Sequence, residues 1–317
     1  MRINVVVGDE NDTFSREIAD KLNAELVEIH TERFKDNEIK ATLKIKPGEK
    51  FKRKKALLAQ RIDRLDPNQN DCIVKIMQII GSLKRLAYLE FDLLTPYIPY
   101  SRQDSIFLPG EPVSLIDIGN LYRNLGVSRF FTVNSHIYGK TSTYLRQYFQ
   151  SPYICVNDIN PAKLFADHLK KKNLKGSLVL GPDEGSEKMV RSLSKHLNTD
   201  YRFLEKERDK TTGDVKIEDK ALEDLEGRDV IIYDDIVSTG GTISRVHKLV
   251  ENYNPRKIYI AIVHLLTKKG IQRLYNLGSD GVITTNSLIS EPSEFYETIP
   301  LEPLISDYIK NPPQRWG

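Results

Sequence analysis

The residues whose types and spacing best suit chemistry lie between Val230 and Thr242. An apolar run, Val230–Tyr233, leads into two adjacent carboxylates, Asp234 and Asp235, and the sequence Ser-Thr-Gly-Gly-Thr follows after two intervening residues. Glycines let the backbone approach an anion closely, and the free amides at the start of a helix favour phosphate. The aspartates would repel a phosphate beside them but accept hydrogen bonds from hydroxyl groups. The segment therefore predicts a pocket that holds a diol at one end and a phosphate at the other, as in ribose 5-phosphate.

A simpler interpretation of this segment is an ordinary strand–turn–helix junction, with the aspartates as caps and Gly-Gly as a turn. The coincidence of acids, hydroxyls and glycines at the end of one strand favours the binding site. A Walker-type nucleotide loop is excluded because no lysine follows the glycines.

Polar residues also follow other apolar runs. The run Phe91–Pro99 leads into Tyr100–Asp104, Phe130–Val133 leads into Asn134-Ser135-His136, and Leu178–Leu180 leads into Gly181–Gly185. In open parallel sheets the ligand crevice lies at the carboxyl ends of the strands. Repeated polar segments at such ends therefore indicate a site, whereas a single one would indicate a turn.

The apolar periodicity predicts alternating strands and helices, and hence parallel sheets with helices on both faces. The predicted strands are Ile3–Val7, Asp92–Ile98, Phe130–Val133, Leu178–Leu180, Val230–Tyr233, Ile258–Val263 and Val282–Thr284, and the predicted helices are Ser15–Leu22, Asp71–Leu89, Leu115–Leu125, Pro161–Lys171, Ser186–His196 and Thr242–Asn252. Either Asn70 or Asp71 can cap the start of the second helix. We expect an N-terminal domain of residues 1–149, a second domain of residues 150–298, and a tail of residues 299–317 that packs back on the first.

Composition narrows the class of protein. The chain has 317 residues, of which 39% are hydrophobic, and its 47 basic and 44 acidic residues leave a net charge of +3. This balance gives no support for a nucleic-acid partner. No apolar run is long enough to cross a bilayer, so we expect no membrane partner. The two cysteines, Cys72 and Cys155, form no CxxC pair, so we expect two buried thiols in a cytoplasmic protein.

The segment around Asp234 resembles the fingerprint of the phosphoribosyltransferase-type fold, which alone fits either an enzyme that consumes phosphoribosyl diphosphate or the enzyme that makes it. Three further segments decide between them. Tyr97–Asp104 looks like the ATP-site motif of the ribose-phosphate diphosphokinase (phosphoribosyl diphosphate synthase) family, Arg33–Glu38 is similar to that family's adenine-contacting segment, and Leu204–Arg208 matches its mobile catalytic loop. Their order and spacing agree with the family from residue 1 to about residue 310.

The resemblance implies an α/β protein of two tandem phosphoribosyltransferase-type domains, each a mainly parallel sheet flanked by helices. It implies transfer of the diphosphoryl group of ATP to the anomeric hydroxyl of ribose 5-phosphate, with AMP released. It also implies Mg²⁺ as cofactor, and a homo-oligomer. Two alternatives stay open, namely a phosphoribosyltransferase and a catalytically inactive relative that regulates an active synthase.

The family's roles, carried over position by position, assign four groups of residues. The catalytic residues are Lys206 and Arg208, and Arg208 also contacts ribose 5-phosphate. The ATP site takes Phe34, Asp36, Asn37, Glu38, Arg102 and Gln103. The ribose 5-phosphate site takes Asp234, Asp235, Ser238, Thr239, Gly240, Gly241 and Thr242. His136 and Asp183 would contact the metal.

The chain departs from the family pattern at several of these positions. Asn134-Ser135-His136 stands where the family usually has Asp-Leu-His, so an acid near the metal is replaced by a neutral residue. Asn37 replaces a glycine, Ser238 stands where many members have aspartate, and Glu184 adds a carboxylate beside Asp183. None of these changes removes a charge assigned to catalysis, which favours an active enzyme.

Overall fold

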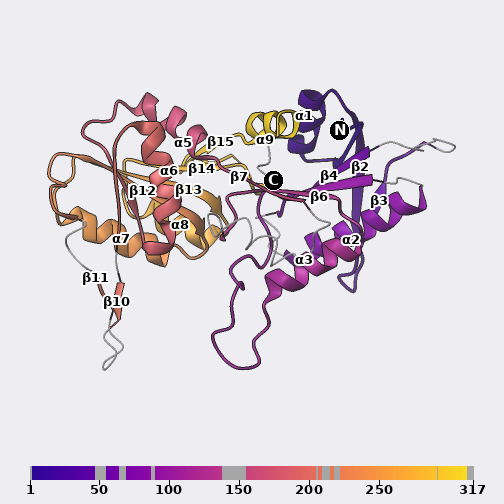
Figure 1. Cartoon of the computed structure of the whole chain (residues 1–317), viewed down its shortest axis with the longest axis horizontal. Helices are drawn as coiled ribbons and strands as arrows, with labels where there is room; N and C mark the ends of the chain where they lie inside the picture. The colour runs from indigo at the N-terminus through magenta and orange to yellow at the C-terminus, as the bar shows by residue number, and fades with distance from the viewer. Residues whose placement is uncertain are drawn as a thin grey trace. The chain divides into compact units, whose positions relative to one another are not determined.

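The protein is described by a computed structural model over residues 2–46, 55–63, 69–86, 90–137, 155–204, 206–208, 215–217, 222–290 and 292–312, with 206–208 and 215–217 described as backbone only. Contacts divide the chain into unit 1, Met1–Ile159 with Leu301–Gly317, and unit 2, Asn160–Pro300 (Figure 1). The sequence placed these boundaries after residues 149 and 298. The first lies later in the structure because the strand Cys155–Ile159 pairs with the sheet of unit 1.

Unit 1 is built on one sheet whose strands run in the order β3-β2-β1-β4-β5-β6-β7. The strands are β1 (Val5–Asp9), β2 (Glu25–Arg33), β3 (Ile39–Leu43), β4 (Lys55–Ala59), β5 (Glu90–Leu94), β6 (Arg129–Val133) and β7 (Cys155–Ile159). All neighbours are parallel except β2 and β3, which form an antiparallel pair. The helices α1 (Thr13–Leu22) and α9 (Glu302–Lys310) pack together on one face, and α2 (Gln69–Arg85) and α3 (Ser114–Asn124) lie on the other (Figure 1).

Unit 2 has a parallel sheet in the order β15-β14-β13-β12-β8-β9. Its strands are β8 (Leu178–Gly181), β9 (Asp200–Phe203), β12 (Asp229–Val237), β13 (Lys257–Leu265), β14 (Gly281–Thr285) and β15 (Glu297–Ile299). The helices are α5 (Ala162–Leu169), α6 (Glu187–Leu197), α7 (Gly241–Glu251) and α8 (Lys268–Tyr275), with short turns η1 (Lys170–Lys172) and η2 (Glu184–Ser186). A separate antiparallel ribbon joins β10 (Lys206–Arg208) to β11 (Val215–Ile217).

The central strands are apolar without alternation because helices cover both faces of each sheet. In β12, the side chains from Val230 to Tyr233 are fully buried, and the Tyr233 ring packs against Phe165 of α5 at a centroid distance of 5.2 Å. Burial of each such aliphatic or aromatic side chain contributes about 1.5–3 kcal/mol. This core fixes the strands whose carboxyl ends carry the polar residues.

The structure corrects several predicted element boundaries. The strand predicted at Asp92–Ile98 is β5, which ends at Leu94, because Pro96 and Pro99 lack the backbone N–H that a central strand donates. The helix predicted at Asp71–Leu89 is α2, which begins at Gln69 and ends at Arg85, while residues 87–89 lie outside the described part of the chain. Asn70 and Asp71 therefore lie within its first turn and do not cap it.

Two further predictions concern the cysteines and the membrane. Both cysteines are free thiols, but only Cys72 is buried, and Cys155 at the start of β7 is partly exposed. Within the described ranges, no helix combines the length and the apolar character needed to span a membrane.

Candidate active site

The turn between β12 and α7 has the geometry of an anion-binding loop. Gly240 adopts φ +73°, a left-handed conformation that favours glycine, and α7 begins at the next residue. Among the described residues, the backbone N–H groups of Thr239, Gly240 and Gly241 have no hydrogen-bond acceptor. Free amides at a helix start, together with the helix dipole, favour a negatively charged group. This geometry would suit a phosphate, and the phosphate site predicted from the sequence stays a prediction.

The residues at the start of helix α8 contact the backbone of this loop and hold it in place. Thr267 donates a hydrogen bond from Oγ1 to the carbonyl oxygen of Ser238 at 2.6 Å and accepts one from the amide of Gly270 at 3.0 Å. A Cβ atom on Gly270 would lie 2.3 Å from the same carbonyl oxygen, so only glycine allows this close approach. Arg273 lies over the turn, with Nη1 3.2 Å from the position that a Cβ of Gly241 would take.

The two aspartates lie within β12 and not in the loop after it, which corrects the sequence-based placement. The strand runs to Val237, and Asp234 is in register with Ile262 of β13. Burial raises the pKa of Asp234 well above its usual value, and the neighbouring charges of Asp235 and Asp183 raise it further. Among the described residues Asp234 has no cationic partner. This edge of unit 2 therefore carries an excess of negative charge beside an anion-binding loop.

Asp183 reaches the same edge from β8, the neighbour of β12. Strand β8 ends at Gly181, and Asp183 comes two residues later. The carbonyl oxygen of Asp183 accepts a hydrogen bond from the amide of Ser186 at 3.1 Å. The amide of Leu204, at the end of β9, donates to the carbonyl oxygen of Gly181 at 3.1 Å. The segment that carries Lys206 and Arg208 thus starts at the same sheet edge, and these two residues lie in β10, of which the structure describes the backbone.

In unit 1, the predicted adenine segment is the turn of the β2–β3 hairpin. The amide of Asn37 donates to the carbonyl of Phe34 at 3.0 Å, and the amide of Glu38 donates to Oδ1 of Asp36 at 3.1 Å. Asn37 adopts φ +71°, a conformation that asparagine tolerates better than other non-glycine residues, which explains how it replaces the family's glycine. The Phe34 ring is 41% exposed and available for stacking.

The second predicted nucleotide segment follows β5. Both Arg102 and Gln103 are exposed, and Arg102 has no ion-pair partner among the described residues. The side-chain oxygen of Gln103 accepts a hydrogen bond from Oγ of Ser114 at 2.5 Å, which ties this loop to the start of α3. An exposed, unpaired guanidinium at a strand end is suited to phosphate oxygens.

His136 is exposed and lies in the loop after β6. The backbone of that loop is held by Asp158 of β7, which accepts hydrogen bonds from the amide and the hydroxyl of Ser135 at 3.0 and 2.6 Å. Burial raises the pKa of Asp158 to about 6, and the Ser135 hydrogen bonds limit the rise. Asp158 therefore positions the turn that presents His136.

The structure groups the predicted residues by unit. Asp183, Asp234, Asp235 and the Ser238–Thr242 loop share the carboxyl edge of the unit 2 sheet, and the hairpin turn, Arg102, Gln103 and His136 follow strand ends at the carboxyl edge of the unit 1 sheet. Across the described residues, no group of three His, Cys, Asp or Glu side chains is arranged to hold a metal by itself.

Sequence reasoning missed Thr267, Gly270, Arg273 and Asp158. The first three lie in or beside α8, which the sequence did not predict because only Ile271 and Leu274 mark its apolar side. A threonine three residues before a glycine was the available signal for the start of that helix.

Comparison with known proteins supports assignment of the chain to the ribose-phosphate pyrophosphokinase family. A family model described as the N-terminal domain of ribose phosphate pyrophosphokinase matches residues 3–126, and the phosphoribosyl transferase domain model matches residues 158–287. The ribose-phosphate pyrophosphokinase of Sulfolobus acidocaldarius is 32% identical over 234 residues, which are 74% of this chain and 77% of that protein. The chain belongs to the ribose-phosphate pyrophosphokinase family.

Other relatives extend the match over nearly the whole chain. The ribose-phosphate pyrophosphokinase of Methanopyrus kandleri is 29% identical and covers 97% of this chain and 98% of its own. The crystal structure of phosphoribosylpyrophosphate synthetase from Mycobacterium smegmatis superposes with a TM-score of 0.82 at 22% identity, covering 98% of each chain. The predicted fold of two tandem phosphoribosyltransferase-type domains is confirmed, and so is the prediction of an enzyme of this family.

Substitution of Gly270 by alanine tests the support of the anion-binding loop. The new Cβ collides with the backbone oxygen of Ser238, so we expect a loss of about 1–3 kcal/mol in the free energy of unfolding, measured by urea denaturation. The matched control is Gly81→Ala in α2, where the nearest atom is the side chain of Arg85 at 3.6 Å. That variant should gain up to about 1 kcal/mol in stability. Equal effects of the two substitutions would contradict the close approach.

Substitution of Asp158 by asparagine tests the electrostatics of the His136 turn. Because the folded-state pKa of about 6 lies above the ordinary aspartate value of 3.8, the charged carboxylate disfavours folding fully above pH 6, and this cost disappears below pH 3.8. Asp158→Asn should therefore gain stability relative to the natural protein as pH rises from about 4 to about 7, by on the order of 2 kcal/mol. Urea midpoints at both pH values measure the change, and a difference that does not vary with pH would rule out this titration.

Proposed function

We propose that the protein transfers the diphosphoryl group of ATP to the anomeric hydroxyl of ribose 5-phosphate, giving 5-phosphoribosyl 1-diphosphate and AMP. The observation that carries the proposal is the edge of unit 2, where the uncompensated carboxylate of Asp234 lies one turn away from an anion-binding loop with free amides. Family membership and the nucleotide-type segments of unit 1 support the identity of the donor.

Within this proposal, Asp234 and Asp235 accept hydrogen bonds from the ribose hydroxyls. The amides and hydroxyls of Ser238, Thr239, Gly240, Gly241 and Thr242 hold the 5-phosphate. Carboxylate-to-hydroxyl bonds are charge-assisted and orient the sugar. The two ends of the site thus fix the orientation of the sugar and of its anomeric hydroxyl within unit 2.

The donor side uses the residues of unit 1. Phe34 stacks beside the adenine, Asp36, Asn37 and Glu38 line its edge, and Arg102 and Gln103 contact the phosphates. The anomeric hydroxyl oxygen attacks the β-phosphorus of ATP and its proton is released to solvent. The bond from that phosphorus to the oxygen bridging it to the α-phosphate breaks, and AMP leaves with that oxygen. Lys206 and Arg208 balance the negative charge on the transferring group, and phosphoryl transfer depends mainly on such positioning and charge neutralisation.

The residues present fit Mg²⁺ as cofactor. The residues that would contact it are Asp183 in unit 2 and His136 in unit 1, and the mutual repulsion of Asp183, Asp234 and Asp235 supports cation binding at the unit 2 edge. Mg²⁺ prefers oxygen ligands and keeps several waters, so phosphate oxygens must complete a site with so few protein ligands. When bound, the ion neutralises charge on the phosphates. We also expect the protein to act as a homo-oligomer.

One assay tests the proposal. The purified protein is mixed with ATP, Mg²⁺ and ribose 5-phosphate, and AMP and 5-phosphoribosyl 1-diphosphate are measured in equal amounts. Absence of AMP above a reaction without protein would refute the proposed activity. Consumption of added 5-phosphoribosyl 1-diphosphate with a purine base would instead indicate a phosphoribosyltransferase.

Asp234→Asn should separate function from stability. Loss of the carboxylate weakens binding of the ribose hydroxyls, so we expect the KM for ribose 5-phosphate to rise about ten-fold or more. The same change removes a carboxylate whose pKa is raised by burial, so the Tm at neutral pH should increase. The control Asp200→Asn changes an exposed acid at the start of β9 and should leave KM unchanged. An unaltered KM for ribose 5-phosphate in Asp234→Asn would disprove the role of Asp234.

A further inference from the structure

The first turn of α2 lies between the two segments assigned to the nucleotide. Helix α2 follows β4, the hairpin turn follows β2, and the Arg102 loop follows β5. These three strands are parallel members of one sheet, so their carboxyl ends share one edge. Asn70 and Asp71, in the first turn of α2, each bind one of these segments.

Asp71 holds the adenine hairpin through Arg33. The guanidinium of Arg33, the last residue of β2, forms an ion pair with Oδ2 of Asp71. The same guanidinium donates from Nη1 to the carbonyl oxygen of Asn37 at 3.2 Å, across the turn that contains Phe34 and Asp36. Both side chains of the pair are partly exposed, at 36% and 22%. Arg33 therefore connects α2 to the far side of the hairpin turn.

Asn70 holds the second segment through Tyr100. The hydroxyl of Tyr100 donates a hydrogen bond to Oδ1 of Asn70. Tyr100 has φ +62°, an unfavourable conformation for a bulky side chain, which persists only where the surroundings enforce it. Its carbonyl oxygen accepts the amide of Gln103 at 2.9 Å, so the strained residue shapes the turn that carries Arg102 and Gln103.

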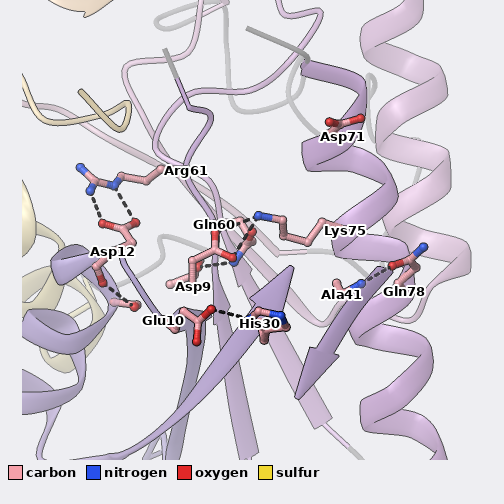
Figure 2. Close-up of polar contacts among 12 residues, drawn as sticks. Asp9, Glu10, Asp12, His30, Ala41, Gln60, Arg61, Asp71, Lys75 and Gln78 are labelled. Carbon is pink, nitrogen blue, oxygen red and sulfur yellow. Dashed lines mark hydrogen bonds and ion pairs between the residues drawn. The ribbon is translucent and has the colours of Figure 1, made fainter. Parts of the chain in front are cut away.

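The rest of α2 is fixed to the sheet on the same face (Figure 2). Asp71, Lys75 and Gln78 are spaced by four and three residues, which places them on one side of a helix. Lys75 pairs with Asp9 at the end of β1 at 3.0 Å, and Gln78 bonds the backbone of β3 at Ala41 and Ile39 at 2.8 and 2.9 Å. Helix α2 is thus held firmly against the sheet, and its first turn in turn contacts both segments assigned to the nucleotide.

We propose that Asn70 and Asp71 are positioning residues of the nucleotide site, which act through Tyr100 and Arg33 on the phosphate-side loop and the adenine hairpin. The inference rests on the proposed ATP site. It assigns a function in binding to a helix turn that the sequence alone marks as a cap.

Kinetics of two variants test the proposal. Asp71→Asn removes the charge at constant shape, and Tyr100→Phe removes only the hydroxyl. We expect each to raise the KM for ATP about three- to ten-fold, while kcat and the KM for ribose 5-phosphate stay within about two-fold. Asp71→Glu, which keeps the charge, should recover most of the affinity for ATP.

The matched control is Glu28→Gln. Glu28 also lies in β2, and it pairs with Arg16 at 2.7 Å. This pair is not part of either segment assigned to the nucleotide. Its loss should leave both KM values unchanged. If Asp71→Asn raises the two KM values together, lowers Tm without changing the KM for ATP, or behaves like the control, the proposal is wrong.

Amide hydrogen exchange gives a readout that does not depend on activity. In the hairpin, the amides of Phe34 and Asn37 donate to Glu38 and Phe34. Asp71→Asn should speed exchange in the peptide spanning residues 33–39 relative to the natural protein, and Glu28→Gln should not. If exchange is faster in Asp71→Asn but the natural protein makes no AMP, the contact between Asp71 and the hairpin is supported and the proposed reaction is refuted. Unchanged exchange would refute the link even in an active enzyme.

Discussion

The constraint on which the site depends is the concentration of negative charge at one edge of the unit 2 sheet. The pairing of β12 with β13 holds Asp234 in a strand, and β8 brings Asp183 alongside, so repulsion cannot separate them without breaking sheet hydrogen bonds. A buried carboxylate with acidic neighbours is unstable by itself and is stabilised by hydroxyl donors or a cation. At this edge the fold therefore holds carboxylates in an unfavourable arrangement that hydroxyl donors or a cation would stabilise.

Unit 1 differs at and just after the carboxyl end of β1, where acidic side chains are paired with basic ones. Asp9 pairs with Lys75, Asp12 with Arg61, and Glu10 contacts His30 at 2.6 Å (Figure 2). The Arg61–Asp12 pair is nearly buried, and the Arg61 guanidinium also lies 4.7 Å from the centre of the Phe14 ring. This pairing stabilises the end of β1, and the segments assigned to the nucleotide lie in exposed turns beyond it. The two sheets thus have corresponding strand orders but differ in charge balance, since Asp234 of unit 2 has no cationic partner among the described residues while Asp9 and Asp12 of unit 1 form ion pairs.

The sequence revealed the strands that are buried on both faces and the loop after β12, because apolar runs and glycine-rich turns are local signals. It did not reveal β2, whose nine residues Glu25–Arg33 are mostly exposed or half-buried, or α8, which has few apolar residues. It also ended the strand before Asp234, since two acids resemble a turn, whereas the structure shows that pairing with β13 carries the strand through them. The contacts of Asn70, Asp71 and Gly270 depend on residues distant in sequence, and no local pattern reports them. The roles of Lys206, Arg208 and the other site residues stay predictions.

The replacement of the family's aspartate by Asn134 has a physical explanation in the loop before His136. Asn134 has φ +42°, which asparagine and aspartate both tolerate, so the turn itself does not distinguish them. The side chain of Asn134 is almost fully buried, and its backbone amide helps to lower the pKa of the neighbouring Asp158. An aspartate there would add a second buried carboxylate beside one whose pKa burial already raises to about 6. Asparagine therefore keeps the turn that presents His136 while it lowers the negative charge of the loop.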